Sequence, residues 1–508
     1  MPWILLLAFF IGHLSTIYVP HGEVASGTVF HDANGNGIRE TGEIGIEGVR
    51  VSNGREVIKT NSQGDWALPV NGQMSEFFVI KPRNWMPPVN SYGTPSYYYV
   101  HRPNGSPASK YRGSSPTGPL PKSIDFPLIK QMEGENLRVL MYGDPQPRNV
   151  VEIGWMTQDV VADCKDYDGD FGMALGDITF DNLNLFRPVA SSLSSVGIPW
   201  WMVIGNHDIN YDAPMDNLSN ESFIASFGPV NYSFDWGPVH FLVLDDVHWI
   251  LPDSGKGHYE ARFSDDALSF AKNDLKFVPR DKLVVVAMHI PLRDVSNGKV
   301  LLDNLSGFDY SVSVSGHTHT QRVDELGEQH GWDKEEPHTH VVHVTACGSW
   351  WSGEIDAERG VPNSTLRDGT PKGWLEWTFD GNEWKFDFRS AGGSPDEQMH
   401  ITLGDMTAEG KIPVWVNVWN GDTRNLVQMR SVGGETWLPL VRRIEKDPAY
   451  VALVADEEKR RKNRWRALPE PVKSTHLWFG EINPLADDAL IEIKVIDRWG
   501  RVHVTQSK

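Results

Sequence analysis

The sequence has few cysteines and no excess of basic residues. Only two cysteines, Cys164 and Cys347, occur among 508 residues, and their distant positions suggest neither a disulfide framework nor a thiolate metal site. We expect both to be free structural thiols, although one disulfide is also compatible with the sequence. Asp and Glu outnumber Lys and Arg by 67 to 47, for a formal net charge of -20. This balance argues against nucleic acid, or an anionic membrane surface, as the main partner.

Long apolar runs are also missing beyond the N-terminus. The run from Trp3 to Ile11 is too short to span a membrane and fits the apolar region of a secretory signal, although no basic segment precedes it. Residues 1–25 therefore predict a signal peptide or a retained N-terminal anchor. We expect an exported protein, periplasmic or extracellular, for which anchoring at the membrane or association with the cell surface are compatible alternatives.

A chain of 508 residues is too long for one hydrophobic core, and two to four domains are expected. Short strand-like runs separated by glycine turns near both ends favour β-sandwich-like modules. A passage rich in proline and serine follows the first of them and is typical of a linker or wrapping loop. The predicted parts are 1–25, the β-sandwich module 26–100, the linker 101–135, an α/β catalytic domain 136–373 and a β-rich accessory domain 374–508.

One loop of the first module matches the EF-hand-type calcium pattern along its whole length. Side-chain oxygens alternate along it, a glycine allows the sharp turn, and a glutamate closes the shell with two oxygens. The alternative is a polar turn that only separates two strands, and we consider calcium the better interpretation. The predicted ligands are Asp32, Asn34, Asn36, the carbonyl of Ile38 and Glu43.

In the central part, five apolar strand-like runs each end in polar residues. Because parallel strands in an open α/β sheet deliver such residues to one edge, we expect them to meet there. Carboxylate, amide and imidazole groups suit Mn, Fe, Zn or Mg rather than thiolate-loving metals, and two such ions suit displacement at phosphorus. Each motif alone is weak, but the series is specific. The residues are Asp144, Gln146, Asp177, Asn206, His207, His289, His317 and His319.

This series, over about residues 137 to 350, resembles the calcineurin-like metallophosphoesterase family. The resemblance implies a sandwich of two β-sheets flanked by helices, and hydrolysis of a phosphate ester by attack of a metal-bound hydroxide. The arrangement with β modules on both sides is similar to a bacterial subgroup. The resemblance assigns Asp177 as the bridge between two metal ions. It assigns Asp144, Gln146 and His319 to the first ion, and Asn206, His289 and His317 to the second. His207 is assigned as the general acid, and Asp208 as the residue that orients it.

The sequence departs from the family pattern at Gln146, where a histidine is usual. Glutamine offers a neutral carbonyl oxygen in place of an imidazole nitrogen, which leaves open both the identity of the metal and the role of Gln146 as a ligand. The competing hypothesis is a non-catalytic exported protein that binds glycans or a surface polymer and keeps a relic core. The intact motifs around Asn206 and His317 argue against it.

Four further residues are candidates for substrate contacts. Arg148 can bind a substrate phosphate or form a surface salt bridge, Trp350 and Trp351 can stack on a substrate ring or pack under a loop, and Arg367 lies on a loop that can close over the site. Small-molecule, headgroup and glycan phosphate esters all stay open as substrates, as do monoesters and diesters. We interpret a second histidine-rich segment as solvated loop and strand rather than a third metal site; it contains His330, His338, His340 and His343.

Overall fold

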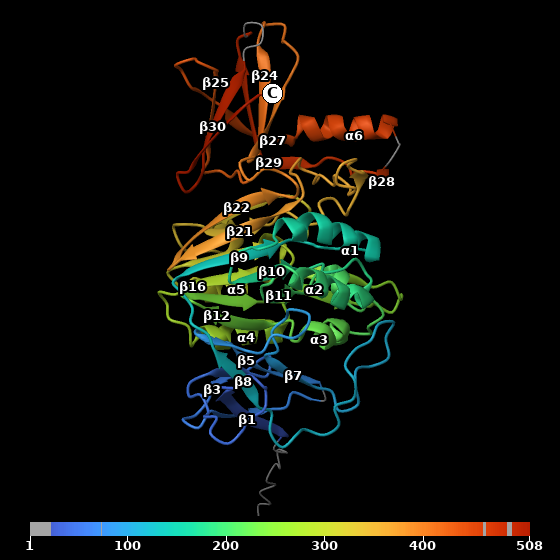
Figure 1. Cartoon of the computed structure of the whole chain (residues 1–508), viewed down its shortest axis with the longest axis vertical. Coiled ribbons are helices and arrows are strands. Elements are labelled where there is room, and N and C mark those ends of the chain that lie inside the picture. Colours follow the sequence, from blue (N-terminus) through green and yellow to red (C-terminus); the bar gives the residue numbers. More distant parts are fainter. Residues whose placement is uncertain (1–21, 73, 461–463, 485–489, 508) are drawn as a thin grey trace, which may run out of the picture.

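The computed structural model describes residues 22–72, 74–460, 464–484 and 490–507. The predicted signal segment therefore lies mostly outside the described residues. Figure 1 shows three parts stacked along the long axis of the molecule: an N-terminal β module, a central α/β core and a C-terminal β module. Among the described residues, no helix is long and apolar enough to cross a membrane. Cys164 and Cys347 are both buried and unpaired, as the sequence predicted.

The core contains two β-sheets packed face to face, as expected. One has five strands in the order β11 (Trp200–Val203), β10 (Phe171–Leu175), β9 (Asn136–Tyr142), β21 (Gly373–Asp380) and β22 (Glu383–Ser390). The other has six in the order β12 (Tyr232–Trp236), β13 (Val239–Val243), β16 (Leu283–Ala287), β17 (Ser311–Ser315), β19 (His338–Val342) and β18 (Arg322–Leu326). The helices on the outside are α1 (Val150–Met156), α2 (Phe186–Ser194), α3 (Glu221–Phe227), α4 (Asp265–Leu275) and α5 (Gly298–Leu305).

The side chains of β9 show why this strand needs both a sheet partner and a helix partner. Successive residues of a strand point to opposite faces, and both faces of β9 are apolar. Val139 and Met141 belong to the apolar cluster between the sheets, whereas Leu140 and Tyr142 belong to the cluster that includes residues of α1 and α2. A strand buried on both faces is typical of a parallel sheet covered by helices.

Two predicted domain boundaries need correction. Strand β21 crosses the boundary predicted at residue 374 and β22 lies beyond it, yet β21 pairs with β9 and extends the core sheet. Trp377 and Phe379 are fully buried in the inter-sheet cluster, so the core continues through β22. Within the predicted linker 101–135, β8 (Phe126–Lys130) pairs with β1 (Val24–His31) and so completes a sheet of the N-terminal module.

Both terminal modules contain two four-stranded sheets, as expected for sandwich-like domains. The N-terminal sheets are β4 (Asp65–Pro69), β1, β8 and β6 (Trp85–Met86), and β3 (Val57–Lys59), β2 (Arg50–Ser52), β5 (Ser75–Ile80) and β7 (Tyr98–His101). The C-terminal sheets are β23 (Met399–Leu403), β24 (Ile412–Val418), β29 (Lys473–Ile482) and β27 (Val441–Lys446), and β26 (Leu438–Pro439), β25 (Leu426–Ser431), β30 (Ile491–Ile496) and β31 (Val502–Gln506).

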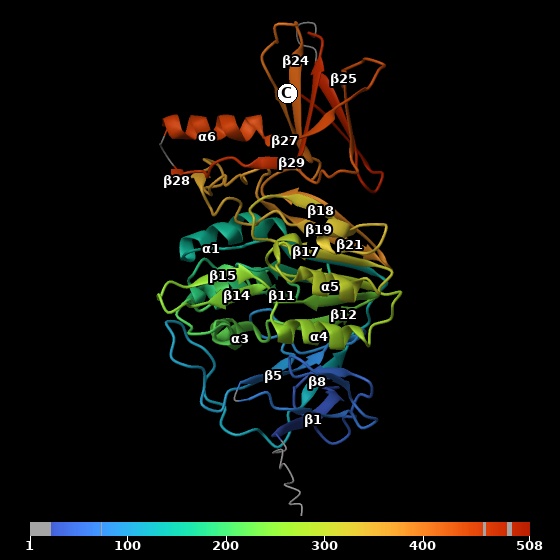
Figure 2. The same cartoon turned by 180° about the vertical axis from the view of Figure 1, so that it is seen from behind.

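The C-terminal module also returns to the core. Its helix α6 (Pro448–Arg460) is followed by the short strand β28 (Arg464–Arg466), which pairs with β20 (Gly353–Glu354) of the core. Seen from behind in Figure 2, β28 lies close to α1. The charged residues of Arg464–Arg466 therefore belong to a strand that is bound to the core. A further two-stranded sheet joins β14 (Val247–Ile250) to β15 (His258–Ala261).

Candidate metal centre

The parallel strands deliver the predicted ligands to one edge of the core. β9, β10 and β11 are parallel, as are β13, β16, β17 and β19. Asp144 follows β9, Asp177 follows β10, Asn206 follows β11, His289 follows β16 and His317 follows β17. Because each residue lies just after the carboxyl end of its strand, residues that are far apart in the chain become neighbours.

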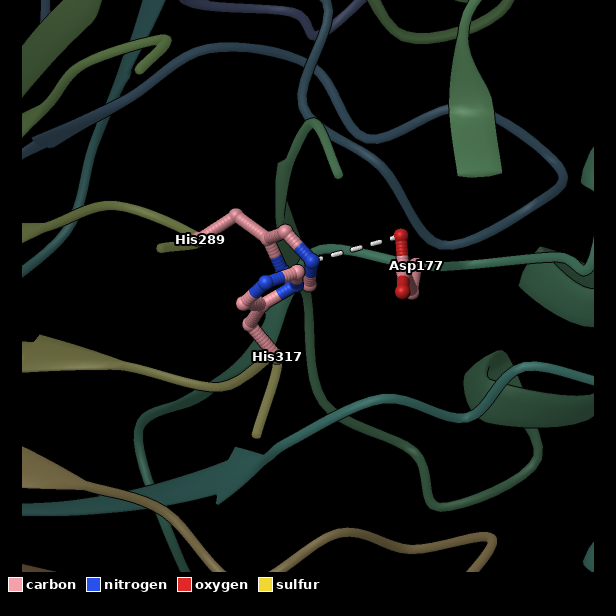
Figure 3. Close-up of side chains that lie close together, drawn as sticks. All are labelled: Asp177, His289 and His317. Carbon is pink, nitrogen blue, oxygen red and sulfur yellow. Dashed lines mark ion pairs between the residues drawn. The ribbon is translucent and has the colours of Figure 1, made fainter. Parts of the chain in front are cut away.

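One group of these side chains has the geometry of a metal site. The ligand atoms of Asp177, His289 and His317 all lie within 4.8 Å of one another, and Figure 3 shows the two imidazoles facing the carboxylate. His289 Nε2 is 3.3 Å from Asp177 Oδ1 and 3.1 Å from Asn206 Oδ1. Burial alone would lower the pKa of His289, but the Asp177 carboxylate and its hydrogen bond raise it to about 10. These are the residues predicted for the bridge and the second ion.

A second set surrounds Asp144. Its Oδ1 accepts a hydrogen bond from the His317 backbone N–H at 2.9 Å, whereas its Oδ2 is buried without a hydrogen-bond partner in the described structure. His319 Nε2 lies 3.3 Å from this Oδ2, and His319 Nδ1 is held by the Gly348 carbonyl at 2.6 Å. A buried carboxylate oxygen without a donor is costly unless a cation compensates it. The residues therefore fit a first ion next to Asp144.

Gln146 has contacts of its own. Its Nε2 donates to Asp177 Oδ2 at 2.8 Å, and its Oε1 accepts the thiol of Cys347 at 3.7 Å. The amide thus orients the carboxylate predicted to bridge the ions, and the predicted role of Gln146 as a ligand would require it to leave one of these contacts.

The backbone is strained where it carries the ligands. Positive φ angles are uncommon outside glycine and cluster at functional sites; here they occur at Asp144, Gln146, Asp177, His317 and His319. The glycines in the motifs allow close approach: a Cβ on Gly205 would overlap the Asp177 amide, and one on Gly316 would overlap the Asp144 carboxylate.

The surroundings of His207 correct one prediction. Its Nδ1 lies 2.7 Å from Asp181 Oδ1, and its ring stacks on Phe180 with centroids 4.1 Å apart. Burial alone would lower the pKa of His207, but the carboxylates of Asp177 and Asp181 outweigh burial and raise it. Asp208, predicted to orient His207, instead uses its fully buried carboxylate to accept the backbone N–H groups of Ile178, Thr179 and Gly205 at 2.9, 3.0 and 3.0 Å. It joins two loops, and Asp181 orients the imidazole.

Three family models match this chain. They are the N terminal of calcineurin-like phosphoesterase over residues 33–112, calcineurin-like phosphoesterase over 137–321, and the C terminal of calcineurin-like phosphoesterase over 340–503. The chain belongs to the calcineurin-like phosphoesterase family. The expected fold class and three-part arrangement are thereby confirmed, and metal-dependent hydrolysis of phosphate esters is the family's chemistry.

The solved structures that are similar to this chain share little sequence identity with it. A purple acid phosphatase from yellow lupin (Lupinus luteus) seeds shares 14% identity over 74% of this chain and 69% of its own, with a TM-score of 0.32. Phosphopantetheinyl hydrolase from Mycobacterium tuberculosis shares 13% over 41% and 89%, with a TM-score of 0.24. A metallophosphoesterase from Sphaerobacter thermophilus shares 14% over 50% and 89%, with a TM-score of 0.23. No curated protein matches this chain.

In this phosphoesterase core, two of the predicted substrate residues lie beside the ligands. The Arg148 guanidinium lies 3.8 Å from the centroid of the Phe180 ring, and its Nη1 donates to the Trp350 carbonyl at 3.0 Å. The Trp350 ring covers His319, with centroids 4.0 Å apart. Arg148 and Trp350 are both partly exposed, so they border the centre on the side open to solvent.

The other two predicted substrate residues have structural positions. Trp351 is fully buried, and its indole N–H donates to the Pro145 carbonyl at 3.0 Å, so it packs beneath the loop. The carbonyl of Arg367 accepts the Val472 N–H at 2.9 Å, and the adjacent Asp368 carboxylate lies 3.1 Å from His476 Nε2. This loop is fixed against the C-terminal module, which contradicts its predicted closure over the site.

The second histidine-rich segment is buried, so its interpretation as solvated is wrong for three of its members. His338, His340 and His343 are 2%, 0% and 0% exposed. The first two face the β17 serines, with Ser313 Oγ 2.8 Å from His338 Nε2 and 2.7 Å from His340 Nδ1. His343 Nε2 accepts the indole N–H of Trp377 at 3.1 Å. They are core histidines, and His330 lies in the short helix Glu328–His330.

The predicted calcium loop is closed by its own side chains. Asp32 Oδ1 accepts the N–H groups of Gly35 and Asn36 at 2.8 and 3.1 Å, and its Oδ2 accepts that of Gly37 at 2.8 Å. Asn34 Oδ1 accepts the Asn36 N–H at 3.0 Å, and Asn36 Oδ1 accepts the Ile38 N–H at 2.8 Å. Glu43 links both ends by accepting the N–H groups of Ala33 and Glu40 at 3.0 and 2.9 Å.

Proposed function

We propose that this protein is an exported two-metal phosphoesterase that hydrolyses a phosphate ester, with His207 as the general acid. The observation that carries the proposal is the unpartnered Oδ2 of Asp144 beside His319, next to the cluster of Asp177, His289 and His317. Two adjacent ligand sets that share one edge of the core suit a pair of ions. Export rests on the apolar N-terminal segment of the sequence.

The ligand sets divide as the family resemblance implies, except that Gln146 is left out of the first set because its amide contacts Asp177 and Cys347. Asp144 and His319 would hold the first ion, Asn206, His289 and His317 the second, and Asp177 lies between the sets through contacts to both His289 and Gln146. When bound, ions of this kind activate a water molecule and offset the charge that grows on the phosphoryl oxygens. Mn, Fe, Zn and Mg all accept these oxygen and nitrogen donors.

The surroundings of His207 support its proposed role as proton donor. Because Nδ1 is held by Asp181, the other ring nitrogen, Nε2, is available to carry the proton to the leaving oxygen. Stacking on Phe180 fixes the plane of the ring, and the 21% exposure of the His207 side chain leaves it accessible to a substrate. The Asp181 carboxylate, which is hydrogen-bonded to the ring, favours the protonated imidazole, and this suits a general acid.

The substrate we propose is a small-molecule, headgroup or glycan phosphate ester. The net charge of -20 disfavours long polyanions, because like charges repel at a distance. Calcium in the loop Asp32–Glu43 would have a structural role, since the loop belongs to the N-terminal module and holds none of the proposed catalytic groups. If calcium binds, the side-chain oxygens of this loop that accept backbone N–H groups would coordinate the ion instead.

The test is hydrolysis of p-nitrophenyl phosphate and bis(p-nitrophenyl) phosphate by protein loaded in turn with Mn, Fe, Zn or Mg. We expect release of p-nitrophenol that a chelator abolishes and metal restores, and loss of at least a hundredfold in kcat in Asn206→Ala. Asn104→Ala, on an exposed loop, is the control and should keep full activity. Hydrolysis that survives chelation, or equal activity of both variants, would contradict the proposal.

A further inference from the structure

The C-terminal module places an arginine beside the metal centre. Strand β28, which contains Trp465 and Arg466, pairs with β20 of the core. Strand β20 begins only a few residues after Trp350 in the chain. In Figures 1 and 2, β28 lies near α1. The Trp465 ring packs edge-on against Trp155 of α1 with centroids 5.0 Å apart. This contact fixes the position of Arg466 relative to the core.

Arg466 and Arg148 share one buried carboxylate. Glu152 is 0% exposed. Its Oε1 accepts Arg466 Nη1 at 2.6 Å and the indole N–H of Trp465 at 3.1 Å, and its Oε2 accepts the Arg148 backbone N–H at 2.7 Å, with Arg148 Nη1 at 3.9 Å. Two guanidinium groups therefore face one carboxylate, and the group as a whole has an excess of one positive charge.

This charge lies at the border of the catalytic residues. Nη1 of both arginines points to the Trp350 carbonyl, at 3.0 Å for Arg148 and 3.5 Å for Arg466. The Trp350 ring covers the metal ligand His319. On the other side, Arg148 lies over Phe180, which stacks on His207. The arginine pair thus lies between His319, proposed for the first ion, and His207, the proposed general acid.

Anchoring the C-terminal module does not account for both cations, because one arginine is enough to neutralise Glu152. The Arg148 and Arg466 side chains are 23% and 35% exposed. Each guanidinium has five N–H donors, and in its polar contacts with the described residues each uses Nη1 alone. Burial, and then the charge of Arg466, lower the pKa of Arg148. Donors and positive charge are therefore left for an anion.

We infer that Arg148 and Arg466 form a subsite for a second anionic group of the substrate, so that the enzyme prefers phosphate esters with another phosphate or carboxylate close to the scissile phosphate. The inference rests on the proposed function, since it deepens the specificity of the same site. Paired guanidinium groups suit this role because their planar donors match phosphate and carboxylate oxygens. The C-terminal module then completes the substrate site through Arg466.

The test compares three non-hydrolysable ligands on the full-length, Mn-loaded protein: methylphosphonate with one anionic group, and methylenebisphosphonate and phosphonoacetate with two. Binding is measured by calorimetry. In Arg466→Gln we expect at least a tenfold loss of affinity for a ligand with two groups, and a change of less than twofold for methylphosphonate. The ligand that shows the larger loss identifies the second group as phosphate or carboxylate.

Arg464→Gln is the matched control, because Arg464 lies on the same strand and carries the same charge. It pairs instead with Glu457 and Glu458 at 3.8 and 3.6 Å, and it should leave all three affinities unchanged. Arg466→Lys, which keeps the charge, should restore part of the loss. Thermal unfolding checks that the variants fold alike.

Equal losses for one-group and two-group ligands in Arg466→Gln, or no loss for any, would overturn the subsite. Binding separates this inference from the proposed function, because it needs no turnover. A protein that hydrolyses phosphate esters without the Arg466 effect keeps its function and loses the subsite. A protein that shows the Arg466 effect but no hydrolysis loses the proposed function and keeps the subsite.

Discussion

Replacing Asp181 with asparagine tests how His207, the proposed general acid, is held. The hydrogen bond between Asp181 and His207 is 2.7 Å long and involves a carboxylate, and such charge-assisted bonds contribute about 1.5–3 kcal/mol. Because the Asp181 side chain is 43% exposed, water screens part of the interaction, and we take the lower end, about 1.5 kcal/mol. The expected loss in kcat is therefore about tenfold.

The assay compares phenyl phosphate with p-nitrophenyl phosphate. A general acid matters most for a poor leaving group, so Asp181→Asn should slow phenyl phosphate about tenfold and p-nitrophenyl phosphate much less. Asp208→Asn is the contrast: it disturbs the buried bonds to Ile178, Thr179 and Gly205, and should lower stability by about 1–3 kcal/mol and slow both substrates alike. Leaving-group dependence in Asp208→Asn but not in Asp181→Asn would refute the assignment.

Three further predictions concern stability. Burial lowers the pKa of His338 to about 3 in the folded protein, whereas its pKa in the unfolded chain is near 6.5. Between these two pH values the unfolded chain binds one more proton than the folded protein, so the free energy of unfolding falls by about 1.4 kcal/mol for each pH unit of acidification. His338→Gln should remove this contribution to the pH dependence. Arg50 is buried and binds Asp274 at 2.6 Å, so Arg50→Met should cost about 3 kcal/mol in the free energy of thermal unfolding. Calcium at a hundred times its Kd should stabilise the N-terminal module by about 2.7 kcal/mol, and Glu43→Gln should abolish this in a calorimetric scan.

Matched variants separate these effects from general damage. His258→Gln changes an exposed histidine, with a side chain 54% accessible, and should leave the pH dependence of unfolding intact. Arg55→Met breaks an exposed pair with Asp266 at 3.4 Å and should cost less than about 1 kcal/mol. Glu47→Gln, exposed and outside the loop, should keep the calcium effect. Equal behaviour of any variant and its control would contradict the corresponding assignment.

The sequence was enough to predict that the candidate ligands cluster, because each follows an apolar run that ends at a turn. Asp177 and His289 are widely separated in the chain, yet the rule that parallel strands end at one edge was enough to bring them together. The glycines before the ligands reflect a steric demand, as at Gly205, where any Cβ would overlap the Asp177 amide. Such local signals are visible in one sequence.

The errors came from contacts that depend on the tertiary structure. Asp208 stands next to His207 in the chain, but neighbouring residues after a strand point in different directions, and Asp181 reaches the ring from another loop. Asp181 follows Gly176 and Asp177 closely in the sequence, and this second carboxylate was the signal that could have indicated its contact with His207. The sequence between Trp374 and Ser390 alternates like any half-buried strand, and only pairing with β9 shows that it belongs to the core. Arg466 was not found because nothing local marks β28 as returning to the centre.

The most direct test of the central claim is the transition-metal content of the purified protein. After reconstitution with Mn and removal of excess ion, mass spectrometry should find two Mn ions per wild-type chain and about one in Asn206→Ala, because only the second ligand set loses a member. Excess calcium during the reconstitution keeps Mn out of the N-terminal loop, whose oxygen donors also accept Mn. Wild-type protein that retains no pair of ions, or an Asn206→Ala protein that retains as many as the wild type, would contradict a two-metal centre built by Asp144, Asp177, Asn206 and the three histidines.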